Sequence, residues 1–388
     1  MSSQIKIDEI YDSHVNFLIG SGASFGIFPT LALKIKNAAN EAQTVETLAT
    51  SFEKTKDARR QLLLFMHYYR RCIRPVCEFT LETATSSAQA TVVSNYRIFL
   101  ETLIQMLDRR RPMERRCNIF TTNYDGLFPL VADAMIQQGA LDFCINDGTR
   151  GFGRKILQAR NFSTFLCQTG AFDQHRSSVP QVNLIQLHGS AYWRKWQNAI
   201  EVDYRLTLGT DIIPSSVSDM VDTFSELLDA DTGSVEALPE LDVDPEHGDA
   251  FWAEYQTLPI VNPTKWKFHE TVFEEHYYQM LRLLSYELER PNAVLVTFGF
   301  SFADEHILNL VKRSLSNPRL QLFVCCFDAE ELAKMRSKFS MFKNVELIAI
   351  EDGVVDFTRF NEQVFSLRRH LPESPGVSAT TPGIPESA

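Results

Sequence analysis

Three polar residues that follow apolar runs could form a catalytic site in this chain. Asn123 and Asp125 come directly after the apolar run 117–122, and His188 comes directly after the run 182–187. Because an imidazole titrates near neutral pH, His188 is a candidate general base, and the polar pair could orient a substrate. Each has a plainer alternative, since Asn and Asp are favoured helix caps and a lone histidine after a strand is more often structural.

A run of small residues near the amino terminus could bind phosphate. It ends the apolar run 17–19 and comprises Gly20, Ser21, Gly22, Ala23 and Ser24. The stretch 31–39 that follows predicts a helix. Glycines let the backbone approach a pyrophosphate closely, and the first amides of a helix supply hydrogen-bond donors. The pattern therefore predicts a phosphate-binding strand–turn–helix unit, although small residues also end strands for packing reasons.

The elements that position these residues alternate between strands and helices. Apolar runs predict strands at 117–122, 182–187, 294–298, 320–327 and 345–350. Helical spacing predicts helices at 127–138, 268–290 and 305–315. The strand at 294–298 ends in Gly299, Phe300 and Ser301. This alternation is typical of an α/β protein with a parallel, Rossmann-like sheet, in which ligands bind at the carboxyl ends of the strands.

Four motifs, taken in this order, resemble the sirtuin family. They are Gly20-Ser21-Gly22-Ala23-Ser24 with Gly26, Ile27 and Pro29, then Thr122-Asn123-Tyr124-Asp125, then His188-Gly189, then Gly299-Phe300-Ser301. The resemblance implies that residues 20–24 hold the pyrophosphate of NAD and that Asn123 positions the nicotinamide ribose and a water molecule. It also implies that Asp125 contacts the carboxamide and that His188 is the base. The remaining NAD-binding residues that it implies are Tyr124, Gly299, Phe300 and Ser301.

Two departures from the sirtuin pattern bear on the reaction. The seven cysteines include no Cys-x-x-Cys pair, so the zinc ribbon of the sirtuin deacylases cannot be built and no metal is expected. The segment 26–31, Gly-Ile-Phe-Pro-Thr-Leu, also lacks the acid and the arginine that the deacylases carry there. Both departures favour water as the nucleophile, which would hydrolyse NAD to nicotinamide and ADP-ribose.

Zinc-free, sirtuin-like effectors of bacterial antiphage systems are known for NAD hydrolysis, and some act with a HerA-type hexameric ATPase. The chain resembles the sirtuin subunit of such sirtuin–HerA systems. This resemblance implies an NAD glycohydrolase that defends by depleting NAD, works as a homo-oligomer and has an ATPase partner. The alternatives are a sensor that binds NAD or ADP-ribose without turnover, and a protein deacylase or ADP-ribosyltransferase. A dehydrogenase fits less well, because Gly26 lies one residue too late for its glycine pattern.

The chain is expected to form one catalytic domain over residues 1–366 with two insertions. Residues 42–116 contain no glycine and predict two or three amphipathic helices, which could form a lid, an oligomer interface or a plain packing layer. Residues 219–249 contain acidic residues but no Lys or Arg, and their glycines and prolines predict an exposed, partly mobile loop without regular structure. Residues 367–388 predict a disordered tail.

The composition limits the possible partners and locations. A formal net charge of -11 argues against nucleic-acid binding across the whole surface. Direct binding of nucleic acid is therefore not expected, although the arginine cluster at 109–116 leaves a local basic patch open. No apolar run approaches the roughly 18 residues that a membrane span needs, and residues 1–12 do not resemble a signal peptide. A cytoplasmic protein with reduced cysteines is therefore expected.

Overall fold

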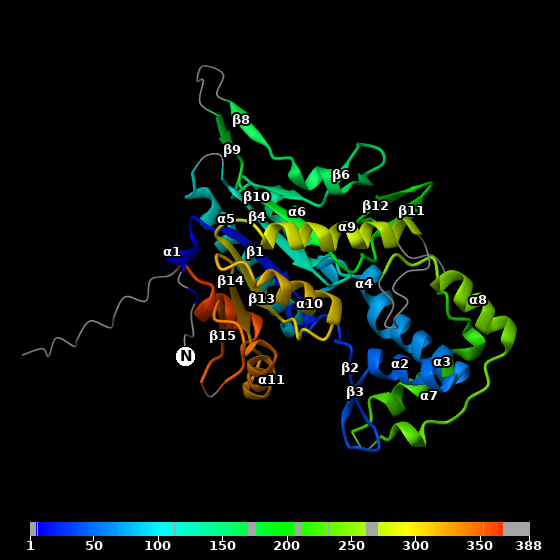
Figure 1. Cartoon of the computed structure of the whole chain (residues 1–388). Helices are drawn as coiled ribbons and strands as arrows, with labels where there is room; N and C mark the ends of the chain where they lie inside the picture. Colours follow the sequence, from blue (N-terminus) through cyan, green and yellow to red (C-terminus); the bar gives the residue numbers. More distant parts are fainter. Residues whose placement is uncertain are drawn as a thin grey trace, which may run out of the picture.

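The computed structural model describes residues 5, 7–111, 114–169, 176–205, 211–231, 233–260, 271–351 and 353–367. Within them, seven strands form a parallel sheet in the order β15-β14-β13-β1-β4-β10-β5 (Figure 1). These strands are β1 (His14–Ile19), β4 (Arg116–Thr121), β5 (Cys144–Asn146), β10 (Gln181–Gln186), β13 (Ala293–Phe298), β14 (Gln321–Cys325) and β15 (Val345–Ile348). The α/β class is confirmed, and the parallel sheet with flanking helices is consistent with a Rossmann-like fold.

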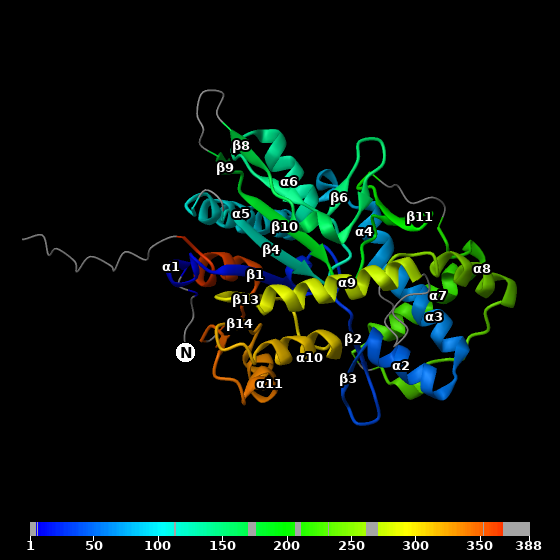
Figure 2. The same ribbon diagram turned by 45° about the horizontal axis from the view of Figure 1, so that its top comes forward.

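Helices cover both faces of this sheet because its strands are apolar on both sides. On one face Phe17 and Ile19 of β1 pack with α5 (Ser87–Asp108) and α6 (Leu127–Gln138). On the other, Leu18 shares a core with α9 (Thr271–Leu288), α10 (Glu305–Ser314) and α11 (Ala329–Phe339) (Figure 2). The short helices are α1 (Ile7–Ile10) and α12 (Phe357–Arg359), the latter followed by a π-helical turn, Phe360–Val364.

A smaller antiparallel sheet, of order β11-β12-β7-β6, joins the second face. Its strands are β6 (Thr149–Arg150), β7 (Ile156–Leu157), β11 (Trp193–Trp196) and β12 (Ala199–Val202). Its first strand, β6, lies within the glycine-containing segment 148–153. A separate hairpin consists of β8 (Cys167–Thr169) and β9 (Arg176–Ser178). Short 3₁₀ helices lie at Leu81–Thr83, Ala159–Ser163, Ser215–Val217 and Val235–Ala237.

A third core lies in a helical module that combines two distant parts of the chain, residues 31–78 and 211–260. Its elements are β2 (Ala32–Lys36), β3 (Ala42–Thr44), α2 (Val45–Thr55), α3 (Ala58–Tyr68), a π-helical turn (Tyr69–Ile73), α4 (Arg74–Glu78), α7 (Ser218–Leu228) and α8 (Pro245–Tyr255). The helices expected between 42 and 116 are present. They divide between two cores, because α2 and α3 belong to this module whereas α5 packs on the main sheet.

Two local predictions are wrong. The stretch 31–39 forms the β2–β3 hairpin instead of a helix, because Leu33 and Ile35 are buried while Ala32 and Lys34 are exposed, which is the two-residue period of a strand. The segment 219–249 contains nearly all of α7 and the first five residues of α8 instead of an irregular loop. Its acidic residues face outward, while Val221 and Phe224 are fully buried in the helical module.

None of the described helices combines the length and the apolar character of a membrane span. The predicted disordered tail, apart from Leu367, lies outside the described residues. All seven cysteines are free thiols. Cys167 is exposed, and the others are buried or partly buried.

The helical module should lose stability in mild acid through His67. This residue is buried and its Nδ1 lies 2.8 Å from Ser225 Oγ. Burial lowers its pKa from 6.5 to about 4. Between these values the unfolded chain binds more protons than the folded chain, so stability falls as the pH drops from 6.5 towards 4. His67→Asn should remove about 2 kcal/mol of the loss between pH 7 and pH 5, as measured by urea unfolding. The partly exposed His247→Asn is the control, and equal pH slopes in both variants would contradict this assignment.

Candidate functional site

The parallel register brings the predicted motifs to one edge of the sheet. Gly20, Asn123, His188 and Gly299 each follow the carboxyl end of a strand, in the neighbouring strands β1, β4, β10 and β13. Backbone hydrogen bonds tie these ends together, including Gly20 N–H to Phe298 O (3.0 Å) and Leu187 N–H to Thr121 O (2.8 Å). Since the strand order reverses at β1, this edge is the switch point where open α/β sheets bind ligands.

The glycines of residues 20–24 serve a close packing contact. A Cβ added to Gly22 would lie 2.7 Å from Gly299 Cα, and a Cβ added to Gly299 would lie 2.7 Å from Ala23 N. Gly20, Gly22 and Ala23 also donate their N–H groups to backbone carbonyls within the protein. The only helix here is a four-residue 3₁₀ turn, Ser21–Ser24, so the predicted helix start behind the turn is absent and supplies no donors. The structural role of these glycines is thus clear, and their binding of phosphate stays a prediction.

A buried polar cluster joins the first two motifs. Ser24 Oγ donates to Asp125 Oδ2 (2.6 Å) and accepts from Asn123 Nδ2 (3.0 Å). The hydroxyls of Ser24 and Tyr96 lie 2.8 Å apart, and Leu127 N–H donates to Asp125 Oδ1 (3.1 Å). Tyr96 comes from the middle of α5, and no sequence signal marked it as a site residue. The cluster fixes the orientation of Asn123 and Asp125 before any ligand arrives.

Charge at this cluster is controlled by burial. Burial raises the pKa of the Asp125 carboxyl above its usual range, and the Ser24 hydrogen bond opposes that change. Burial also raises the pKa of Tyr96 well above its usual value, with the nearby Asp125 adding to the effect, so Tyr96 is a neutral hydroxyl at physiological pH. A dry site of this kind strengthens each hydrogen bond made to a substrate.

Asn123 carries an unused hydrogen-bond acceptor. Its side chain is 7% exposed, and its Oδ1 has no hydrogen-bond partner among the described residues. A buried polar atom without a partner costs about 1–3 kcal/mol, so such atoms usually receive a donor from water or a ligand. A hydroxyl of a sugar or a water molecule would satisfy this oxygen, which fits the predicted role of Asn123.

His188 is held by a carboxylate that the sequence prediction missed. Its Nε2 lies 3.1 Å from Asp304 Oδ2, and both side chains are 12% exposed. Asp304 also caps α10, because its Oδ1 accepts from the amides of His306 and Ile307. The ring of Tyr277 on α9 lies 6.3 Å from the His188 ring. With Nε2 engaged by Asp304, Nδ1 is the ring nitrogen left to take a proton.

Two predicted binding residues direct their side chains into the protein. Phe300 is 8% exposed and packs edge-on against Phe302 in the second core. Tyr124 packs against the helical module, and its carbonyl accepts from the Ala191 amide (3.1 Å). Any contact of Phe300 with a ligand would therefore come from its backbone. Ser301 is exposed, and its carbonyl accepts from Lys338 Nζ (3.2 Å).

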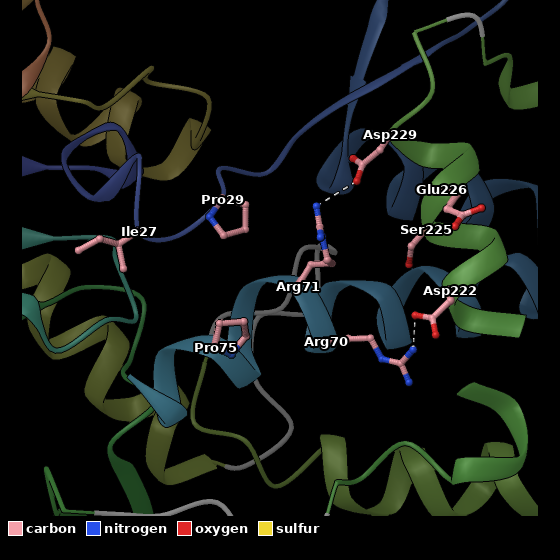
Figure 3. Close-up of a pocket in the computed structure, with 9 residues that line it drawn as sticks. All are labelled: Ile27, Pro29, Arg70, Arg71, Pro75, Asp222, Ser225, Glu226 and Asp229. Carbon is pink, nitrogen blue, oxygen red and sulfur yellow. Dashed lines mark hydrogen bonds and ion pairs between the residues drawn. The ribbon is translucent and has the colours of Figure 1, made fainter. Parts of the chain in front are cut away.

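A cavity of about 770 Å³ lies next to this edge but contains neither Asn123 nor His188. Arg70 and Arg71 reach from the π-helical turn to Asp222 of α7 and to Asp229 at the end of that helix, at 2.6 and 3.1 Å (Figure 3). Its other lining residues are Ile27, Pro29, Pro75, Ser225 and Glu226. Because Ile27 and Pro29 follow the glycine turn, the cavity connects that turn to the helical module. The polar cluster remains the better candidate for chemistry, since the charged groups of the cavity largely neutralise one another.

In the described part of the chain, no three His, Cys, Asp or Glu side chains are grouped as metal ligands. The fold and the site together define an α/β protein with a Rossmann-like parallel sheet and a polar cluster at its switch point. Comparisons with protein-family models and with curated proteins give no match for this chain.

Proposed function

We propose that this chain is an NAD glycohydrolase that cleaves NAD to nicotinamide and ADP-ribose. The observation that carries the proposal is the buried Ser24–Asn123–Asp125 cluster. Among the described residues, its acceptor Asn123 Oδ1 has no hydrogen-bond partner, and it lies at the same sheet edge as His188. The sirtuin-like order of the motifs supports the same substrate. The role in antiphage defence, the cytoplasmic location and the HerA-type ATPase partner follow from that resemblance and belong to the proposal.

The proposed reaction breaks the bond between the ribose C1′ and the nicotinamide nitrogen. The leaving group departs as neutral nicotinamide, water adds to C1′, and one proton is released. The transition state resembles an oxocarbenium ion, so the site must mainly orient the ribose and the water. Asn123 Oδ1 would accept a hydrogen bond from the water or a ribose hydroxyl. His188, oriented by Asp304, would receive the proton through Nδ1.

Free NAD hydrolase activity would be toxic, so we further propose that turnover depends on a homo-oligomer or on the ATPase partner. The test is to incubate the purified chain with NAD, alone and with a candidate ATPase, and to follow nicotinamide and ADP-ribose by chromatography. Stoichiometric release of both products is the expected result. Binding of NAD without turnover under every condition would instead identify a sensor. Equal turnover by the monomer and the complex would rule out the dependence on assembly.

Asp304→Asn should lower the rate of NAD cleavage at least about 10-fold while leaving the fold intact. Asn caps helices as well as Asp does, so α10 should keep its start. The substitution removes the negative charge beside His188 and so weakens the interaction that orients the ring. The measurement is the pH profile of NAD turnover together with the unfolding temperature. Asp328→Asn, which changes the corresponding cap of α11, is the matched control. If the pH profile of Asp304→Asn matches that of the wild type, Asp304 has no role in the reaction.

A further inference from the structure

The small antiparallel sheet presents a positively charged face in an acidic protein. Its register places Arg194, Glu201, Ile156 and Arg150 in one row across β11, β12, β7 and β6. Side chains in one row point to the same side of a sheet, and neighbours along a strand point to the other. The opposite side carries the buried Leu157 and Ile200. The row therefore faces away from the core, at the side of the molecule labelled β6, β11 and β12 in Figure 1.

One buried carboxylate organises two arginines on this face. Glu201 is 5% exposed, and its Oε2 accepts from Arg154 at 2.5 Å and from Arg194 at 2.8 Å. The Arg194 hydrogen bond lowers the pKa of Glu201, so the carboxylate stays charged. The two arginine side chains remain 43% and 47% exposed. A guanidinium has five N–H donors, so each arginine can still bind a second anion.

Aromatic rings lie among these cations. The Arg154 guanidinium lies 4.7 Å from the centre of the Trp196 ring, a cation–π contact that holds both groups in place. Trp196 is 36% exposed, and Phe152 at the tip of the β6–β7 hairpin is fully exposed. Gly151 gives this hairpin a backbone φ of 125°, which other residues rarely adopt. We call the set Arg150, Phe152, Arg154, Arg194 and Trp196 the arginine–aromatic face.

The charge of the arginine–aromatic face contrasts with that of the whole chain. The face contains three arginines and, in the same row, the carboxylate of Glu201, whereas the full sequence has a net charge of -11. A cationic surface of this kind attracts a polyanion. The exposed rings favour a nucleic acid over an acidic peptide as the polyanion. Bases stack on aromatic side chains, whereas a peptide of acidic residues has no ring to stack.

We propose that the arginine–aromatic face binds single-stranded nucleic acid. Arg150, Arg154 and Arg194 would contact successive phosphates, while Trp196 and Phe152 would stack on bases. Guanidinium groups suit this task because their planar forks match phosphate oxygens. The site is separate from the polar cluster at the sheet edge, so it stands whether or not the chain cleaves NAD.

The test is fluorescence anisotropy of a fluorescein-labelled 12-nucleotide oligo(dT) with the full chain in 50 mM NaCl. Three phosphate contacts predict that raising the salt to 200 mM weakens binding by roughly 20-fold. Trp196→Ala should weaken binding at least about 5-fold through lost stacking, and Trp196→Phe should restore part of it. Arg150→Ala should weaken binding and flatten the salt dependence. Matched controls are Tyr286→Ala, an exposed aromatic residue on α9, and Arg319→Ala, an exposed arginine before β14.

Three results would overturn the proposal. The first is the absence of oligo(dT) binding at 50 mM NaCl. The second is equal binding by the wild type, Trp196→Ala and Arg150→Ala. The third is competition by polyglutamate as strong as that by unlabelled oligo(dT), which would identify an acidic protein as the partner of this face.

Discussion

Asn123→Ala is expected to slow NAD cleavage by at least about 100-fold while the protein stays folded. The substitution removes Oδ1, the buried acceptor that has no hydrogen-bond partner among the described residues. It also removes Nδ2, which donates to Ser24 Oγ (3.0 Å). If Oδ1 acts mainly in the transition state, kcat should fall far more than KM rises. Steady-state kinetics of nicotinamide release gives both constants.

The matched control for this prediction is Asn118→Ala, on β4, the strand that Asn123 follows. Asn118 Nδ2 donates to Asn16 Oδ1, and its own Oδ1 accepts from Asn183, both at 2.8 Å. Its loss should reduce stability by about 1–3 kcal/mol and leave the turnover of folded enzyme near the wild-type rate. If Asn118→Ala slows cleavage as much as Asn123→Ala, the effect of Asn123 is structural and its catalytic role is wrong.

Gly299→Ala should destabilise the fold by about 3 kcal/mol or more. Gly299 has a φ of 61°, where a Cβ is strained, and the added carbon would meet Ala23 N at 2.7 Å and the Gly22 backbone at 2.9 Å. Backbone atoms on two neighbouring strand ends would have to separate. The unfolding temperature should fall by about 4 °C or more, which calorimetry would detect.

Gly139→Ala separates the two causes of this effect. Gly139 ends α6 with a φ of 68°, close to that of Gly299, but a Cβ there would meet no atom within 4 Å. Its substitution should cost only the left-handed strain, about 1 kcal/mol. Equal losses in the two variants would show that strain alone matters and that the close approach of residues 20–24 to Gly299 contributes nothing.

The sequence predicted the central fold well where burial alone decides the structure. The strands at 117–122, 182–187 and 294–298 and the helix at 127–138 appear within a residue of their predicted bounds. These segments are buried on both sides or have one wide apolar face, so their period is clear. The same signal misled at 31–39, where Ala, Leu and Lys favour a helix but the burial of Leu33 and Ile35 requires a strand.

The acidic helices were missed because their partners are distant in sequence. The segment 219–249 is rich in acidic residues, glycines and prolines. Its only apolar residues with clear helical spacing are Val221, Phe224 and Leu228. The face that they form is buried against α3, which lies about 150 positions earlier. Pro245 and Gly248, which suggested a break, occupy the first turn of α8, where proline is favoured.

The candidate site could be located from sequence but not completed. Asn123, Asp125 and His188 follow strand ends, so the parallel sheet brings them to one edge as expected. Asp304 and Tyr96 were missed because each acts through a contact with a residue more than 70 positions away. A single sequence carries no signal for such a contact, since an aspartate before a helix and a tyrosine within one are both ordinary.

The helical module has a consequence for anyone who shortens this chain. Its core is shared by residues 31–78 and 211–260, so neither segment has a complete interior of its own. Deleting 45–78 alone would expose Phe224 and Phe251, and deleting 218–255 alone would expose Leu63 and Phe65. Truncated proteins of either kind should aggregate when expressed, because a large apolar surface would face water. The two segments therefore form one structural unit, and both should be gained or lost together in evolution.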